Sequence, residues 1–279
     1  MTLSTCCQRL SRLGAFLSLS LILTLSVAQG AETVSPQPAC PDGSRIVSQS
    51  PYLTLVVQWL GRGGCLVGVS RYDKLDLPHT GGVLDPDGAA IAKLHPTVLL
   101  APDWVTAATL AKVTPAGAQA VRLGGFGSVA DMIAMMEATA RAIHAPETLP
   151  KIQAFQTELN QRLAAGPGKG RRVLLLSACS GAPYAYGPQT LLGDLFARAG
   201  FEILATDPRL KFYGDVPALA KDVAALKPEL VLNFSPVAAA QCSAALGNLP
   251  ARIVTLPGDD FAHPGPRLLR GLDDVQEAL

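Results

Sequence analysis

A helical segment that begins at Ser128 divides the 279-residue chain into two halves with similar sequence patterns. Ser128 and Asp131 are spaced as in a capping box, which satisfies free backbone N–H groups at the start of a helix. Pro146 and Pro150 interrupt the segment, which predicts two helices or one broken helix. Apolar residues recur at helical spacing: Val129, Met132, Met136, Ile143, Ile152, Phe155, Leu159 and Leu163. We expect a helical spacer over residues 128–167; an ordinary helix of one large α/β domain is the alternative.

The first 30 residues have the pattern of a secretory signal peptide. Arg9 and Arg12 form a positively charged start, and residues 15–27 form an apolar run that is short for a membrane span. Small residues at positions 28–30 suit cleavage. We therefore expect a mature chain that begins near Ala31 and is exported as a soluble periplasmic protein.

The charge of the chain argues against a nucleic-acid partner. The full sequence has a formal net charge of +1, and removal of the two arginines of the signal peptide, which has no acidic residue, lowers it to −1. A chain that binds nucleic acid usually carries a basic patch or stripe. No basic run is present in the sequence.

Four cysteines remain after the signal peptide, namely Cys40, Cys65, Cys179 and Cys242. An even number of cysteines in an oxidising compartment favours disulfides. The chain has no C-x-x-C motif, so the sequence does not favour a zinc site or thioredoxin-like chemistry. With two lobes, Cys40–Cys65 and Cys179–Cys242 is the simplest pairing, although four cysteines allow three connectivities.

The N-terminal half, residues 31–127, alternates between strand-like and helical patterns. Strands are expected at residues 45–48, 65–70, 97–100 and 120–123, and helices at 52–60, 89–94 and 106–112. This order predicts a parallel sheet with right-handed crossovers, whose ligands bind beyond the carboxyl ends of the strands. The residues expected there, as one wall of a cleft, are Ser50, Pro51, Tyr52, Arg71, Tyr72, Pro102, Asp103, Trp104 and Phe126.

The C-terminal half, residues 168–279, predicts a second α/β lobe by the same reasoning. Strands are expected at residues 172–177, 201–204, 230–234 and 252–256, and helices at 189–199, 216–226, 238–246 and 266–279. Residues 178–187, 211–215 and 257–263 are expected to be loops. The residues that we expect on the facing wall of the cleft are Ser180, Tyr184, Tyr186, Phe212, Tyr213, Phe234, Asp260, Phe261 and His263.

Aromatic side chains are the most informative members of these two walls. Planar rings at the edge of a cleft suit a flat macrocycle or a catechol chelate, and we expect about half of them to face a ligand. Most follow predicted strands, although aromatic residues make up only 5% of the chain. They are Tyr52, Tyr72, Trp104, Tyr184, Tyr186, Phe212, Tyr213 and Phe261.

The sequence lacks the patterns of other kinds of site. The four histidines do not form the spaced cluster that a directly bound zinc or manganese ion needs; they are His79, His95, His144 and His263. The chain contains no G-x-S-x-G motif, so we predict no catalytic residue. The methionines of the spacer indicate helix packing rather than metal binding.

Several stretches resemble the periplasmic binding proteins of the vitamin B12, haem and ferric-siderophore importers. They are residues 45–73 (RIVSQSPYLTLVVQWLGRGGCLVGVSRYD), 94–100 (LHPTVLL), 187–204 (GPQTLLGDLFARAGFEIL) and 264–267 (PGPR). The resemblance implies the helical-backbone class of this family, class III, in which two Rossmann-like α/β lobes are joined by a single helix. It also implies that a metal chelate is held between the lobes, with no resident cofactor or metal.

One departure from this family concerns its partner, an inner-membrane ABC permease. Family members carry a glutamate on each lobe, five positions before the leucine of a Leu-x-Pro motif, that engages arginines of the permease. The corresponding residues here are Ala89 and Lys221. Nearby acidic residues that can take over the role are Asp85, Asp87 and Asp222.

The sequence therefore predicts a periplasmic solute-binding protein that captures cobalamin, a ferric siderophore or haem and delivers it to an ABC importer. The alternative is a secreted enzyme or cofactor-assembly factor on the same scaffold, not coupled to an importer, and the two missing glutamates favour it slightly. The fold does not select among the three chelates, because pocket side chains decide which ligand is bound.

Overall fold

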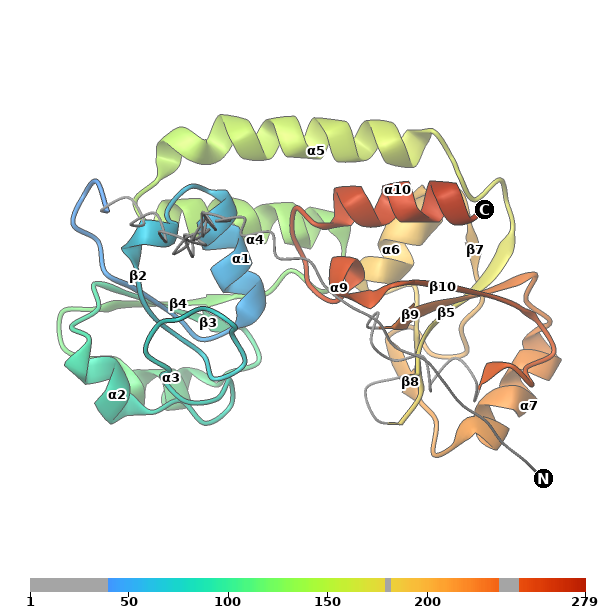
Figure 1. Ribbon diagram of the computed structural model, residues 1–279, viewed down its shortest axis with the longest axis horizontal. Coiled ribbons are helices and arrows are strands. Elements are labelled where there is room, and N and C mark those ends of the chain that lie inside the picture. Colours follow the sequence, from blue (N-terminus) through green and yellow to red (C-terminus); the bar gives the residue numbers. More distant parts are fainter. Residues whose placement is uncertain (1–39, 179–181, 236–245) are drawn as a thin grey trace, which may run out of the picture. The chain divides into compact units, whose positions relative to one another are not determined.

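The computed structural model describes residues 40–178, 182–235 and 246–279, all of which fall within the unit Gln37–Leu279. The predicted signal peptide and Ser180 lie outside the described residues. None of the helices in the described ranges is both long and apolar enough to cross a membrane. The unit contains two β-sheets with helices packed on them (Figure 1).

The first sheet has the parallel arrangement that the sequence predicts. Its strands run in the order β2-β1-β3-β4, and all three pairings are parallel. The strands are β1 (Ile46–Ser48), β2 (Leu66–Val69), β3 (Val98–Pro102) and β4 (Gln119–Leu123). The helices are α1 (Pro51–Trp59), the 3₁₀ turn η1 (Gly63–Cys65), α2 (Gly88–Lys93) and α3 (Ala107–Val113).

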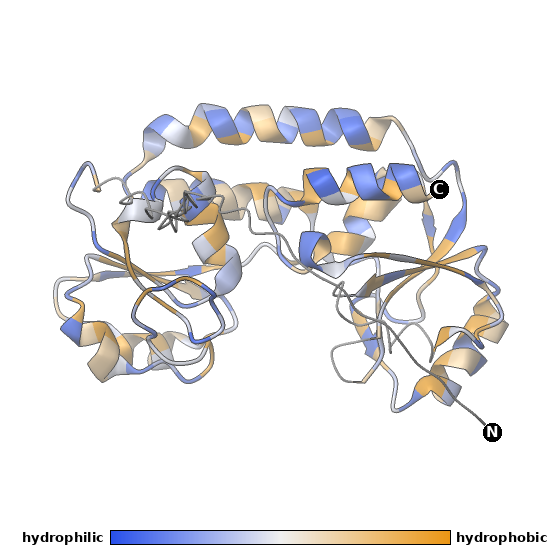
Figure 2. Cartoon of the chain, viewed as in Figure 1, coloured by the Kyte–Doolittle hydropathy of each residue, from blue (hydrophilic) through white to orange (hydrophobic). Residues whose placement is uncertain are grey.

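Alternate residues of the central strands pack against different helices. Ile46 and Val98 belong to the core shared with α1, whereas Val47 and Leu99 belong to the core shared with α2 and α3. Side chains of a strand alternate between the two faces of its sheet, so both faces of this sheet are covered. Burial on both faces explains why these strands are nearly continuous apolar runs, as Figure 2 shows.

The predicted helical spacer is two helices, α4 (Val129–Ala142) and α5 (Leu149–Ala164), with a 3₁₀ turn, η2 (Pro146–Thr148), between them. The Ser128 hydroxyl accepts the N–H of Asp131 at 3.1 Å, which confirms the predicted N-cap. The break falls at His144, whose φ of 53° is left-handed, just before Pro146. The spacer methionines are buried, which confirms their predicted packing role.

The second sheet contains six strands in the order β10-β9-β5-β6-β8, and β7 pairs separately with β5. The strands are β5 (Arg172–Ser177), β6 (Tyr184–Tyr186), β7 (Glu202–Ile203), β8 (Leu210–Phe212), β9 (Leu230–Ser235) and β10 (Arg252–Pro257). The helices are α6 (Leu191–Arg198), α7 (Val216–Leu226), α9 (Gly258–Phe261) and α10 (Leu268–Ala278). Most of the helix predicted at residues 238–246 lies outside the described residues.

The prediction that the second sheet is parallel is only partly correct. Strands β5, β7, β9 and β10 pair in parallel, but β6 and β8 are antiparallel to their neighbours. Both fall in segments that were expected to be loops, and α9 falls in a third such segment. β6 and β8 have only three residues each, so their sequence period is too short to be recognised, and they pair with each other across more than 20 residues of the chain.

A disulfide joins Cys40 to Cys65, 25 residues apart, as the sequence predicts. It connects the first described residue to the turn between α1 and β2. Cys65 is buried in the core with α1. The pairing of Cys179 with Cys242 concerns residues outside the described ranges.

Candidate functional site

Aromatic rings from the first lobe gather where β3 and β4 end. The Trp104 ring lies 5.3 Å from Phe126 and 6.0 Å from Tyr52, measured between ring centroids. Phe126 also contacts Tyr52 edge-on at 5.1 Å. Trp104 is 46% exposed and Tyr52 only 1% exposed, so Tyr52 supports the outer rings from beneath.

The buried Tyr52 ring is fixed by its hydroxyl, which donates to the carbonyl oxygen of Leu123 at the end of β4. Burial, with a smaller effect of the Asp103 carboxylate, raises the pKa of Tyr52 well above its ordinary value. The phenol is therefore neutral and acts as a hydrogen-bond donor within the lobe. Its ring also lies 6.5 Å from that of His263, which belongs to the second lobe.

The loop after β2 provides further predicted residues. The Arg71 guanidinium lies over the Tyr72 ring at 5.7 Å and forms an ion pair with Asp85. Tyr72 is 60% exposed. Ser50 is buried at the start of α1, and its backbone carbonyl accepts from the Ser48 hydroxyl. Tyr72 is thus accessible to a ligand, whereas Ser50 serves the start of the helix.

The facing rings of the second lobe come from β6 and β8. Tyr184 lies 5.2 Å from Tyr186 and 5.4 Å from Phe212, and the two phenol oxygens are 3.3 Å apart. Tyr186 packs edge-on against Phe234 at 5.8 Å. Since residues two apart in a strand share one face, the antiparallel strand β6 is what places both phenols together.

The structure places three other predicted residues of this wall in the interior. Tyr213 is buried and its hydroxyl donates to Asp222 at 3.1 Å. The Phe261 ring is 3% exposed and lies 4.8 Å from the ring of Phe234. Asp260 is buried and forms an ion pair with Arg270. Tyr213 and Asp260 therefore stabilise the lobe itself, while Phe261 forms the floor of a cavity.

That cavity, with a volume of about 210 Å³, has lining residues from both lobes. Phe126 comes from the first lobe, and the remaining residues come from the second. They include Tyr184, Tyr186, Thr190, Leu191, Leu192, Leu210, Phe261, Ala262 and Pro264. The sequence analysis missed residues 190–192 because they begin α6 rather than follow a strand. Thr190 caps α6 by accepting the N–H of Gly193, and such a cap before an apolar run is the signal that was available.

A second cavity, of about 340 Å³, also has lining residues from both lobes. Three of them were predicted, Pro51, Tyr72 and His263. Burial and, to a smaller extent, Arg267 lower the pKa of His263, while Asp73 and Asp259 act in the opposite direction. Burial raises the pKa of Asp73, although its carboxylate accepts from the Ser70 hydroxyl at 2.6 Å. The charged residues lining this cavity are Asp73, Lys74, Asp259 and Arg267.

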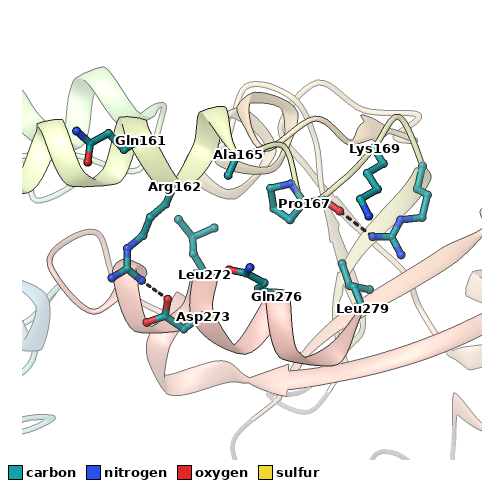
Figure 3. Close-up of a pocket in the computed structure, with 10 residues that line it drawn as sticks. Gln161, Arg162, Ala165, Pro167, Lys169, Leu272, Asp273, Gln276 and Leu279 are labelled. Atoms are coloured by element: carbon teal, nitrogen blue, oxygen red, sulfur yellow. Dashed lines mark hydrogen bonds and ion pairs between the residues drawn. The ribbon is translucent and has the colours of Figure 1, made fainter.

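A larger cavity, of about 630 Å³, lies between α5 and α10, and none of the predicted site residues that the structure describes lines it. Figure 3 shows Arg162 paired with Asp273 across the space between the two helices. Lys169 and Arg171 lie beyond the end of α5, and Arg171 donates to the Pro167 carbonyl. The charged residues that line this cavity are held mostly by local ion pairs and by hydrogen bonds to carbonyl groups.

One group of possible metal ligands lies close together in the described part of the chain, formed by Cys40, Asp42 and Cys65. The two sulfur atoms are joined to each other in the disulfide, so neither is a free thiolate. Metal binding by cysteine requires the thiolate. The oxidised pair therefore does not make a metal centre.

The acidic residues near the two expected docking positions are engaged within their own lobes. Asp87 caps α2 by accepting the N–H groups of Ala89 and Ala90. Asp85 pairs with Arg71. Asp222 pairs with Lys211, while Ala89 and Lys221 themselves are exposed.

Neither a scan against protein-family models nor a search of curated proteins found a match for this chain. Solved structures do match. The periplasmic haem-binding protein HutB of Vibrio cholerae has a TM-score of 0.71 at 19% identity, over 84% of this chain and 98% of HutB. A periplasmic haem-binding protein of Pseudomonas aeruginosa has a TM-score of 0.67 at 23% identity, over 84% and 92%.

The periplasmic vitamin B12-binding protein BtuF of Vibrio cholerae matches with a TM-score of 0.65 at 18% identity, over 84% of this chain and 96% of BtuF. These neighbours are binding proteins rather than enzymes by their descriptions. The alignments span nearly the whole length of each neighbour. The chain therefore has the fold of the class III periplasmic binding proteins, two α/β lobes joined by helices, in agreement with the resemblance found in its sequence.

Proposed function

We propose that this chain is a periplasmic solute-binding protein that holds a metal chelate between its two lobes and delivers it to an ABC importer. The candidate chelates are cobalamin, a ferric siderophore and haem. The observation that carries the proposal is the set of aromatic rings that the two lobes bring to one junction. Phe126 of the first lobe lines one cavity together with Tyr184 and Tyr186 of the second. Trp104 packs on Phe126, and Phe212 packs on Tyr184. The descriptions of HutB and BtuF support it, since those proteins bind haem and vitamin B12.

The exposed rings would contact the ligand. Trp104, Tyr72 and Phe212 are 46%, 60% and 66% exposed. Exposed apolar surface that is contiguous often marks a ligand-binding groove. A planar chelate stacks on such rings and removes both surfaces from water. Tyr52 and Phe261 would act beneath them, because both are buried. Pro51, Arg71 and His263 would border the ligand from the neighbouring cavity and loop.

The two lobes, residues 31–127 and 168–279, would close modestly over the ligand. The spacer, residues 128–167, limits the movement, because α5 packs against α4, α6 and α10. Ligand binding then shifts the population toward the closed form by its difference in affinity for the two forms. No covalent step is needed for capture or release.

Docking to a permease would differ from the pattern of the resembled family. Ala89 has no charge, Lys221 has the opposite charge, and the three nearby acids are engaged within the lobes. The permease would therefore use other contacts. The same observation favours the second candidate, an exported factor that binds a chelate on this scaffold without an importer.

Titration of the purified mature protein with cobalamin, a ferric siderophore and haem tests the proposal. We expect saturable, one-to-one binding of one of them, with quenching of tryptophan emission. Absorbance of the protein as purified shows whether a coloured ligand is already bound. Absence of binding to all three would contradict the transport proposal. Growth of a strain that lacks the importer, with the chelate as its sole source of that metal or cofactor, separates the importer-coupled protein from the exported factor that acts without an importer.

A further inference from the structure

The cavity of about 210 Å³ that the two lobes share has an unusual set of polar side chains. None of the residues that line it in the described part of the chain is a lysine, arginine or histidine. The two internal segments outside the description, residues 179–181 and 236–245, contain none of these residues in their sequences either. Among the described lining residues, the side chains are otherwise apolar apart from three hydroxyl groups, those of Tyr184, Tyr186 and Thr190.

The Thr190 hydroxyl is already occupied. It donates to the carbonyl oxygen of Gly187 at 2.7 Å and accepts the N–H of Gly193 at 3.1 Å. Its single proton is used to close the turn before α6. The two phenols are therefore the polar groups that this wall can offer to a ligand.

The two phenols share one hydrogen bond. Their oxygen atoms lie 3.3 Å apart, and either can be the donor. Two hydroxyls carry two protons, and the bond between them uses one. When Tyr186 donates to Tyr184, the proton of Tyr184 remains for an acceptor on the ligand. Burial raises the pKa of Tyr186, which keeps its phenol neutral.

This arrangement disfavours a charged group on the part of the ligand that enters the cavity. A carboxylate or catecholate placed in an apolar cavity loses its hydration, and no cation on the lining compensates it. A neutral carbonyl oxygen loses much less and accepts the phenol proton directly. At about 210 Å³ the cavity is also smaller than a typical site for a whole ligand, so it receives one edge of the chelate.

We propose that the cavity recognises a neutral, carbonyl-bearing edge of the chelate, such as the amide-substituted rim of a corrinoid, and that Tyr184 and Tyr186 determine this specificity. This inference rests on the proposed function. It distinguishes a corrinoid from haem, whose propionates are charged, and from an anionic siderophore. Phe126, Leu191 and Phe261 enclose the apolar part of the same edge.

Matched ligands and single-oxygen variants test the inference. The ligands are cobalamin, a cobalamin monocarboxylic acid in which one amide is hydrolysed, and haem. We expect the wild type to bind cobalamin at least about ten-fold more tightly than the acid, since one unpaired buried polar contact is worth about that factor. Tyr184→Phe and Tyr186→Phe should each weaken cobalamin binding by about three- to ten-fold.

Tyr213→Phe is the matched control, because it removes a phenol oxygen that bonds to Asp222 in the interior, outside the cavity. It should leave cobalamin affinity unchanged. Unchanged affinity in both the Tyr184 and Tyr186 variants, with melting temperatures that show folded protein, would overturn the inference. Tighter binding of the acid or of haem than of cobalamin would also overturn the inference, but the proposed function would then stand. If the wild type binds none of these ligands but binds a ferric siderophore, the inference fails and the proposed function stands; if it does not bind the siderophore either, both proposals fail.

Discussion

The backbone N–H of Leu191 donates to the carbonyl oxygen of Phe126 at 2.6 Å. This bond joins the first residue of α6 in the second lobe to the loop between β4 and α4 of the first. One turn along the helix, the Asp194 carboxylate accepts the N–H of Val129 at 2.8 Å. The wall of the shared cavity is thus held to the start of the spacer by two hydrogen bonds, which places Phe126 against the second lobe.

The first prediction concerns Asp194. Asp194→Ala removes the acceptor for the first N–H of α4 as well as an i,i+4 ion pair with Arg198, so we expect a loss of about 1–2 kcal/mol in unfolding free energy. Glu137→Ala is the control, because it breaks an i,i+4 pair with Arg141 and no contact between lobes. It should cost at most about 0.5 kcal/mol. Urea unfolding measures both; equal losses would show that the Val129 contact adds nothing.

The second prediction compares the two tryptophans. Trp104→Ala should weaken chelate binding by about 1–3 kcal/mol, as expected for an aromatic anchor, and leave the melting temperature nearly unchanged, because the ring is half exposed. Trp59→Ala should lower the melting temperature and leave chelate binding nearly unchanged. The Trp59 ring packs on Phe155 at 5.7 Å and lies 4.4 Å from the Lys151 ammonium group. Ligand titration and thermal unfolding of both variants check this. Equal chelate binding by wild type and Trp104→Ala would remove Trp104 from the site.

A pH dependence follows from His263. Burial lowers its pKa in the folded protein, so the unfolded chain binds the proton more readily near the ordinary value of 6.5. Stability should therefore fall as the pH decreases through 6.5 toward the lower folded value, and it should be fully present above 6.5. Asp73, whose pKa is raised from 3.8 by burial, acts in the opposite direction.

His263→Gln should remove this part of the dependence. The measurement is urea unfolding of wild type and variant between pH 5.5 and 7.5. We expect the difference in unfolding free energy between the two proteins to change over this interval. A constant difference would mean that His263 does not titrate differently in the folded and unfolded states.

The last prediction concerns Gly193 in the first turn of α6. A methyl group there would collide with the carbonyl oxygen of Gly187 and would also lie 2.8 Å from Pro188. Gly193→Ala should therefore be destabilising by about 1–3 kcal/mol, the range for overpacking. Gly214→Ala adds its methyl group where no atom lies within 4 Å, and should be neutral or slightly stabilising. If denaturation curves show similar stabilities for the two variants, the close approach of α6 to the 187–188 turn is wrong.

The elements that depend on local signals could be predicted from the amino-acid sequence. The spacer helices are encoded by the Ser128 cap, the apolar period and the break before Pro146, all within a few residues of one another. The first sheet follows from four apolar runs separated by helical patterns, because a strand–helix–strand order leaves few possible topologies. The disulfide of Cys40 with Cys65 was the simplest of three possible pairings, because both cysteines lie in one lobe, and the structure confirms it.

The meeting of the aromatic residues at the junction depends on contacts between separate elements. Tyr184 and Tyr186 share a face because β6 is a strand, and β6 pairs with β8, about 25 residues further along the chain, as well as with the nearby β5. Tyr52 and Tyr213 were both expected on a wall of the cleft, but they are buried. The Leu123 carbonyl and the Asp222 carboxylate accept hydrogen bonds from their hydroxyl groups, which makes this burial tolerable. Local sequence periodicity does not predict such contacts, since the partner of each group lies in another element. The cavity, and the side of it that α6 forms, therefore exist only in the folded chain.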